Sequence, residues 1–215
     1  MSNDSTPIIP SIRLLPNGPL VVKQLKRLTN SRGDPLESKE SFTLCRCGAS
    51  ANKPFCDGSH RKIGFSDQNS AERSKDVWDT YAGKEISIHD NRFLCSHAAI
   101  CTDRLKSVFK LGEEPWIDPD GDTAGAIAEL VRQCPSGALS YTFQSLPQDD
   151  EAPEPGITVS KNGPYFVTGE VSLEGGQWSK DADRRRFALC RCGASANKPF
   201  CDGSHWEAGF SDEKN

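Results

Sequence analysis

One sixteen-residue segment occurs twice in this chain, and its cysteines and histidine constrain the fold more than any other feature. The segment CRCGASANKPFCDGSH runs from 45 to 60 and again, letter for letter, from 190 to 205. The same offset aligns Asn17-Gly18-Pro19 with Asn162-Gly163-Pro164 without a gap. A repeat of this kind indicates one structural unit present in two copies.

Each copy predicts a β-hairpin that leads into the repeated segment. We expect the unit to span roughly 11–67 and 156–212. SIRLL and PLVVKQL in the first copy, and GITVS and PYFVTGEVSL in the second, flank an Asn-Gly pair. Asn-Gly supplies the positive φ angles of a tight reversal. A third short strand should then lead into the first cysteine of each segment.

The stretch between the copies predicts a separate α+β domain. A polar connector at 66–76 and an acidic, proline-rich one at 146–156 bracket it. Within it, EISIHDN and ALSYTF predict strands, 98–109 predicts a short helix, and 122–133 predicts a helix capped by Asp122 or Thr123. The expected domains are 1–67, 77–143 and 156–215.

Nine cysteines need an explanation in a chain with a pI near 5.6 and a mean hydropathy of -0.58. An odd number cannot all pair as internal disulfides. The amino terminus lacks a basic region followed by an apolar run, and no long apolar stretch occurs, so we expect a cytoplasmic protein without a membrane segment. In a reducing compartment, metal ligation accounts for the thiols better than disulfides do.

The charge of the chain is uneven. Residues 76–155 carry 6 Lys and Arg against 15 Asp and Glu, whereas residues 1–75 carry 12 against 7. So acidic a middle section argues against a nucleic-acid partner and favours docking on basic protein surfaces. A merely solvated acidic surface is the alternative. Neither a P-loop signature nor a dinucleotide glycine fingerprint is present, and we expect no enzymatic activity.

The repeated segment has the composition of a metal site. Cys-x-Cys can direct two thiolates at one point, while Cys56 and His60 lie four apart on one face of a helical turn that Asp57 or Ser59 could cap. Such a set of donors fits either a tetrahedral zinc ion or a two-iron cluster. A catalytic Cys/His pair is a weaker alternative, because no orienting Asn or Asp signature accompanies it.

The repeated segment closely resembles the CDGSH iron-sulfur family, also called the NEET family, whose pattern is met in full twice. The Asn-Gly-Pro hairpin and the downstream Gly-Phe pairs match as well. The resemblance implies two [2Fe-2S] clusters and an α+β fold in which two small β-rich units pair as an intramolecular pseudo-dimer, so that the protein is a monomer. The implied ligands are Cys45, Cys47, Cys56 and His60 in the first unit, and Cys190, Cys192, Cys201 and His205 in the second.

The middle section resembles the divergent single-cluster ferredoxins over about 77–143. The resemblance rests on CSHAAIC after a strand and on a distant Cys134-Pro135, and it implies that Cys95, Cys101 and Cys134 hold a cluster. Ala98 stands where a central thiol is usual, so the cluster is [3Fe-4S], or [4Fe-4S] with His97, a hydroxide or an exogenous thiol as fourth ligand. Three ordinary buried thiols are the alternative. We expect this ferredoxin-like domain to dock with its acidic surface near the first unit.

These expectations favour an electron carrier that works with a redox protein. Cluster storage or transfer to a protein partner is the alternative, as is redox or pH sensing. Replacing a thiolate by a neutral imidazole should raise the reduction potential. An imidazole also titrates near neutrality, so protonation can compete with its bond to iron.

Overall fold

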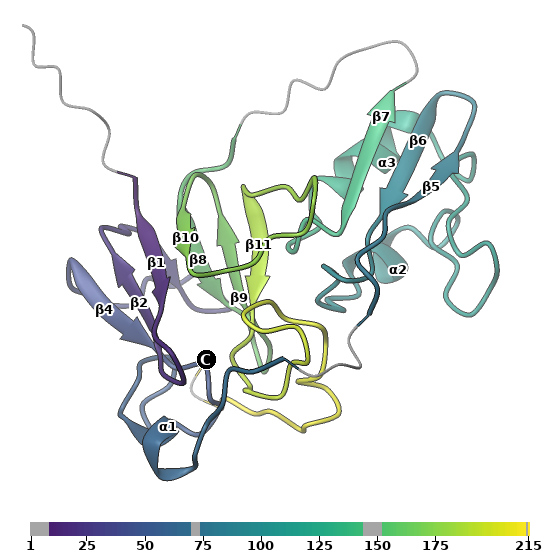
Figure 1. The fold of residues 1–215 in the computed structure, drawn as a ribbon. Helices are drawn as coiled ribbons and strands as arrows, with labels where there is room; N and C mark the ends of the chain where they lie inside the picture. Colours follow the sequence, from purple (N-terminus) through teal and green to yellow (C-terminus); the bar gives the residue numbers. More distant parts are fainter. Residues whose placement is uncertain (1–8, 70–73, 144–151, 214) are drawn as a thin grey trace, which may run out of the picture.

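The computed structural model describes residues 9–69, 74–143, 152–213 and 215, which form three small sheets and three short helices (Figure 1). This is the expected α+β class. Within these residues, no helix has the length and apolar character needed to cross a bilayer. The elements are β1 (Ser11–Leu14), β2 (Leu20–Lys23), β3 (Leu28–Thr29), β4 (Ser41–Leu44), α1 (Ser59–Lys62), β5 (Asp79–Ala82), β6 (Ile86–Asp90), α2 (Ile100–Arg104), α3 (Ala124–Val131), β7 (Leu139–Phe143), β8 (Gly156–Val159), β9 (Tyr165–Thr168), β10 (Ser172–Glu174) and β11 (Arg186–Leu189).

The predicted hairpins are present in both copies. β1 and β2 pair antiparallel, as do β8 and β9. Asn17 and Asn162 have positive φ angles of 49° and 50°, but Gly18 and Gly163 do not have positive φ. The connections run over 15–19 and 160–164, so the reversals are wider than the two-residue turn that Asn-Gly predicts. The third strand of each copy, β4 or β11, pairs with the second strand of its hairpin and ends one residue before the first cysteine.

Each of these two sheets also contains a strand from the other copy. The strand orders are β10-β1-β2-β4 and β11-β9-β8-β3. β10 pairs parallel with β1, with Ser11 opposite Ser172, and β3 pairs parallel with β8, with Leu28 opposite Ile157. The sequence does not identify β3 and β10 as exchanged strands.

A single apolar core lies between the two sheets. Its buried members alternate along the strands of both copies, since each sheet presents one face to the interior. Neither copy has enough apolar chain to build this core alone. The core residues include Ile12, Leu20, Val22, Leu28, Leu44, Ile157, Val159, Tyr165, Val167, Phe187 and Leu189.

The two repeated segments also touch each other, through their glycines. A Cβ atom at Gly193 would lie 2.8 Å from the carbonyl oxygen of Cys47, and a Cβ atom at Gly48 would clash with the carbonyl oxygen of Cys192. Both glycines have positive φ angles. The contacts are therefore reciprocal between counterparts 145 residues apart, as in a two-fold related pair.

The middle section folds as a three-stranded antiparallel sheet, β5-β6-β7, with α2 and α3 alongside (Figure 1). The hydroxyl of Thr123 accepts a hydrogen bond from the backbone N–H of Ala126, so Thr123 is the cap of α3, one of the two residues predicted. The helix expected over 98–109 is only α2, five residues long. Ala99, just before it, has a φ of 60°, which interrupts helical geometry on that side.

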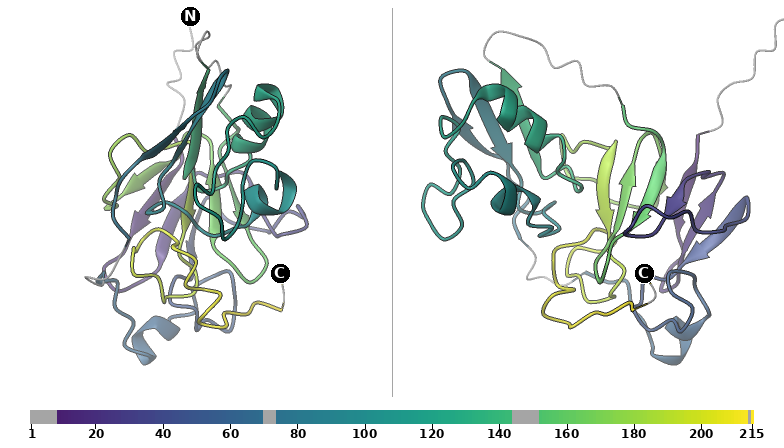
Figure 2. Two further views of the ribbon diagram at one scale, coloured as in Figure 1. Left: turned by 90° about the vertical axis from the view of Figure 1, so that its right-hand side faces the viewer. Right: turned by 180° about the vertical axis from the view of Figure 1, so that it is seen from behind.

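The middle domain docks on the second copy, so the expected docking near the first copy is wrong. Trp78 Nε1 donates to the carbonyl oxygen of Lys180 at 3.0 Å, and Asn197 Nδ2 donates to that of Phe93 at 2.8 Å. Figures 1 and 2 show the second copy between the middle domain and the first copy. The buried side chain of Asn197 and an apolar cluster that brings Phe93 together with Ala182 contribute to this contact.

Candidate metal centres

The loop after β4 brings the first two cysteines of the first copy together. Cys45 follows the last residue of β4, and its N–H donates to the carbonyl oxygen of Pro54 at 2.8 Å. The N–H of Cys56 donates back to the carbonyl oxygen of Thr43 at 3.0 Å. The loop thus folds over on itself, and the Sγ atoms of Cys45 and Cys47 lie 3.6 Å apart.

The second pair of donors is His60 in α1 and Cys56 just before it. Cys56 Sγ lies 3.5 Å from His60 Nδ1. Neither predicted residue is the N-cap of α1, which is Gly58 at a φ of 87°, and Cys56 precedes the helix. Asp57 nevertheless accepts a hydrogen bond from the N–H of Ser59 at 3.0 Å and so orders the turn between the two donors.

The second copy repeats this arrangement. Cys190 Sγ and Cys192 Sγ lie 3.7 Å apart, and Cys201 Sγ lies 3.4 Å from His205 Nδ1. The chain around His205 forms successive turns in place of an α-helix. The identical segments therefore place their four donors alike, although the helix after the site forms in only one copy.

Each close pair of donors has the spacing of two ligands on one metal atom. Two tetrahedral ligands about 2.3 Å and 2.1 Å from one metal lie about 3.6 Å apart, which is close to each Sγ–Sγ and Sγ–Nδ1 distance. Across the described ranges, no group of three or more Cys, His, Asp or Glu side chains is arranged to hold a single ion. Each pair therefore has the spacing for one metal.

Burial disfavours the thiolate form of these cysteines unless a metal cation binds it. Burial raises the pKa of Cys47 to about 11 and that of Cys201 to about 12. In the second copy, the hydrogen bond between the paired thiols raises the pKa of Cys190 and lowers that of Cys192. Metal binding would therefore displace protons from these thiols, which makes metal affinity dependent on pH.

The two sites differ in their access to solvent. Cys56 and His60 are partly exposed to solvent. Their counterparts Cys201 and His205 are only 2% and 5% exposed. The middle domain causes the difference. The ring of His97 packs so closely on Gly203 that a Cβ atom there would lie 2.8 Å from His97 Cδ2, and Trp206 Nε1 donates to the carbonyl oxygen of His97 at 3.3 Å.

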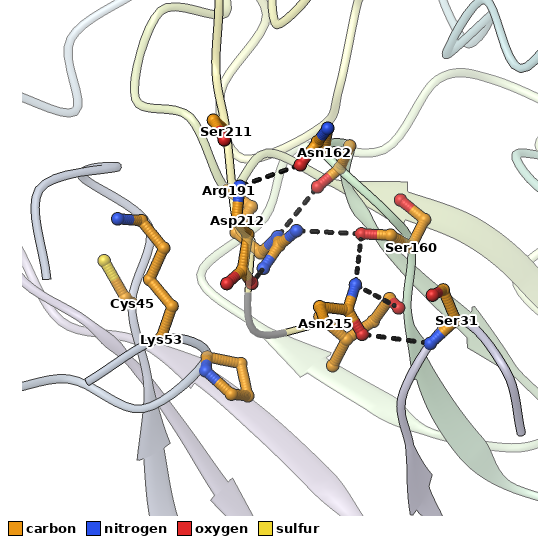
Figure 3. A network of polar contacts seen from close by, with 12 residues as sticks. Ser31, Cys45, Lys53, Ser160, Asn162, Arg191, Ser211, Asp212 and Asn215 are labelled. Atoms are coloured by element: carbon orange, nitrogen blue, oxygen red, sulfur yellow. Dashed lines mark hydrogen bonds and ion pairs between the residues drawn. The ribbon is translucent and has the colours of Figure 1, made fainter. Parts of the chain in front are cut away.

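In each copy, the arginine of the Cys-Arg-Cys sequence donates hydrogen bonds to the turn of the β-hairpin. Arg191 is buried and forms an ion pair with Asp212, while its Nε and Nη2 donate to the carbonyl oxygens of Gly163 and Ser160, each at 2.8 Å (Figure 3). The N–H of Asp212 in turn donates to Asn162 Oδ1 in the turn.

Arg46 makes the equivalent contacts in the first copy. Its Nη2 lies 2.7 Å from Asp67 Oδ2, and its Nε donates to the carbonyl oxygen of Gly18 at 2.6 Å. Burial opposes ionisation of Asp67, but the Arg46 guanidinium outweighs it and lowers the pKa of that carboxyl group. The sequence analysis does not identify these arginines, although their place inside the repeated Cys-Arg-Cys is the signal that could have found them.

The middle domain brings its three cysteines to one cavity. Cys95, Cys101 and Cys134 all line it, with Ala98 at the position of the missing thiol. The cavity has a volume of about 30 Å³. Burial raises the pKa of Cys95, and that of Cys101 to about 11. The three thiols therefore line one cavity of the middle domain.

His97, one of the possible fourth ligands, does not line this cavity, since its ring lies against Gly203. Asp90, Arg92, Ser96 and Ser136 do line it and were not predicted. Burial raises the pKa of Asp90 to about 6, although Arg92 nearby opposes this. Arg92 also lies over the ring of Trp116, 4.3 Å from its centroid, and so helps to close the mouth of the site.

Comparison with known proteins gives two family matches. The model of the family described as "Iron-binding zinc finger CDGSH type" matches residues 17–61 and 162–206, and that described as "Divergent 4Fe-4S mono-cluster" matches 81–144. Among curated proteins, the "Uncharacterized protein YjdI" of Escherichia coli strain K12 and of Escherichia coli O157:H7 are each 34% identical over 61 residues, which is 28% of this chain and 80% of the relative. No solved structure matches.

Proposed function

Because this chain belongs to the CDGSH iron-binding family and carries a divergent 4Fe-4S mono-cluster domain between its two CDGSH units, we propose that it is a three-cluster electron carrier without enzymatic activity of its own. In this proposal each CDGSH unit holds a [2Fe-2S] cluster and the middle domain holds a [3Fe-4S] or [4Fe-4S] cluster. When bound, such clusters accept and release single electrons. The protein would act in the cytoplasm, with a redox protein as partner.

The paired donors support a two-iron cluster in each CDGSH unit. In each unit, two thiols lie close together, and a thiol and an imidazole form a second close pair. A tetrahedral zinc ion would show the same close pairs, so the match to the iron-binding family is what favours iron. The three thiols around the middle cavity support a larger cluster there.

The exchange of β3 and β10 supports a pseudo-dimer inside one chain. Each exchanged strand completes a sheet of the other unit, and a single core joins both units. A second copy of the chain is not needed to complete either unit. The proposal is therefore a monomer with no nucleic-acid or membrane partner.

The single observation that carries the electron-carrier proposal is the docking of the cysteine loop of the middle domain on the second CDGSH unit. His97, between Cys95 and Cys101 in sequence, contacts Gly203, and Cys95 is close enough to Cys201 to influence its titration. Single-electron exchange weakens steeply with distance, so adjacent redox sites within one chain favour this role. The exposed first unit is then the side that a partner reaches.

Cluster transfer is the second candidate, and the partial exposure of Cys56 and His60 favours it. An acceptor protein could reach these ligands, whereas the middle domain covers their counterparts. Under this candidate, the first site delivers its iron and the second retains it.

One pair of mixing experiments separates the two candidates. The holo-protein is mixed anaerobically with a reduced flavin-dependent ferredoxin reductase, and separately with an apo-ferredoxin. We expect rapid reduction by the reductase and no movement of iron. Iron transfer that is lost in Cys56→Ser but retained in the matched variant Cys201→Ser would instead establish the second candidate.

A further inference from the structure

The cavity of the middle domain has three thiols but also two buried oxygen atoms without partners. Asp90 Oδ1 and Ser96 Oγ are the buried side-chain polar atoms without a hydrogen bond in the part of the chain that the structure describes. Asp90 is 1% exposed and Ser96 is 2% exposed, and both line the cavity of Cys95, Cys101 and Cys134. Buried polar groups are nearly always paired, so unpaired ones at a site of this kind indicate a missing partner.

From this we propose that Asp90 is the fourth protein ligand of the middle cluster, which makes that cluster a [4Fe-4S] type with three thiolates and one carboxylate. The inference rests on the proposal that the middle domain binds a cluster. It goes beyond that proposal by assigning the donor that Ala98 cannot supply. It also removes the need for a hydroxide or an exogenous thiol.

The geometry of Asp90 suits this role. Asp90 is the last residue of β6, opposite Leu139 of β7, and therefore sits on rigid sheet above the cavity. Its Oδ2 lies 3.7 Å from Arg92 Nε, which leaves Oδ1 as the free oxygen. The carboxylate also lies within electrostatic range of the Cys95 thiol. Iron accepts carboxylate oxygen as a ligand, as it does in many non-haem sites.

Arg92 limits the charge that this arrangement gathers. Its Nη1 lies 3.8 Å from Cys95 Sγ, and its guanidinium is held over the ring of Trp116. A fixed cation beside three thiolates and a carboxylate stabilises the ionised donors without occupying Oδ1.

Ser96 is the weaker of the two oxygen donors. A carboxylate is already an anion at neutral pH, whereas a serine hydroxyl must lose a proton to become an equally strong ligand. Ser96 also adjoins Cys95 in sequence, so both donors would come from one short loop. Ser96 is therefore the matched control for Asp90.

The test compares Asp90→Asn with Ser96→Ala in the full-length, anaerobically reconstituted protein. Each variant is oxidised with ferricyanide and analysed for iron, sulfide and electron paramagnetic resonance. In oxidised protein the [2Fe-2S] clusters are diamagnetic, so a signal reports a [3Fe-4S] cluster in the middle domain. We expect Asp90→Asn to lose one ferrous ion per chain, with ferricyanide accepting the electron released, and to gain that signal. Wild type and Ser96→Ala should keep the fourth iron and stay silent.

Several results would overturn the proposal. They are a silent Asp90→Asn variant with unchanged iron, a Ser96→Ala variant that alone loses iron, or wild-type protein that holds only [3Fe-4S] despite excess iron. A wild-type protein with no middle cluster would refute the proposed function itself, which is a distinct result. If Asp90→Asn does not fold, Asp90→Cys serves instead, since a thiolate there should retain all four irons, and loss of the fourth would refute the assignment.

Discussion

At the scale of single residues, identical segments behave differently because their surroundings differ. His60 is partly exposed, whereas His205 is almost fully buried under the middle domain. The sequence predicts eight CDGSH donors from their local spacing, and the structure places them in four close pairs. It could not predict the difference in access, which depends on residues about a hundred positions away such as His97.

Arg191 offers the clearest prediction at this scale. Arg191→Met should lower the free energy of unfolding by about 3–5 kcal/mol, because it leaves the buried Asp212 without its ion-pair partner. Arg46→Met should cost less, since Asp67 is 20% exposed and water can partly replace the guanidinium. Urea unfolding of the holo-protein, followed by far-ultraviolet circular dichroism, measures both.

The exposed Arg61 is the control for these variants, and Arg61→Met should change stability by less than about 0.5 kcal/mol. Equal free energies of unfolding for Arg191→Met and Arg61→Met would mean that the buried ion pair between Arg191 and Asp212 does not stabilise the fold.

At the scale of elements, the hairpins follow from sequence and the exchanged strands do not. Asn-Gly turns and alternating apolar residues are local signals, and β1, β2, β8 and β9 form where they predict. β3 is two residues long, and its partner β8 lies more than 120 residues away. Two residues contain no sequence signal for the strand with which they pair. The pairing of β3 with β8 depends on the packing of the core that the two copies share.

Leu28 in β3 tests whether the exchange joins the units energetically. Leu28 is 2% exposed and packs in the shared core, so Leu28→Ala should lower the free energy of unfolding by about 2–5 kcal/mol. Because β3 belongs to the sheet of the second unit, both CDGSH clusters should be lost in one transition at a lower urea concentration. Visible absorption follows the loss of the clusters, and circular dichroism follows the unfolding of the chain.

The control for this variant is Ile63→Ala, at a side chain 54% exposed, which should leave the transition almost unchanged. Two separated transitions in Leu28→Ala, with the second unit unaffected, would show that the units fold independently.

At the scale of the whole molecule, the middle domain makes the two CDGSH units inequivalent. It contacts the second unit through Asn197 and Trp206 and leaves the first exposed. The sequence predicts three domains and their order. It gives the wrong docking side, because net charge is a weak guide to a contact made by a few buried hydrogen bonds and apolar side chains.

Matched glycines test this docking directly. Gly203 and Gly58 occupy the same position in the two segments, with φ angles of 89° and 87°, but only Gly203 packs against His97. Replacing either by alanine should cost about 1 kcal/mol of backbone strain. Gly203→Ala should in addition displace the middle domain, which the fluorescence of Trp206 and faster proteolysis of the middle domain would report. Identical behaviour of the two variants would contradict the observed interface.

The central claim is that this chain holds three clusters that exchange electrons reversibly while the iron stays bound. An anaerobic dithionite titration, followed by visible absorption and electron paramagnetic resonance with iron analysis before and after, tests it most directly. The account predicts uptake of three electrons per chain, full recovery of the oxidised spectrum on reoxidation, and no loss of iron. A colourless protein that contains zinc, or one that releases iron on the first reduction, would contradict it.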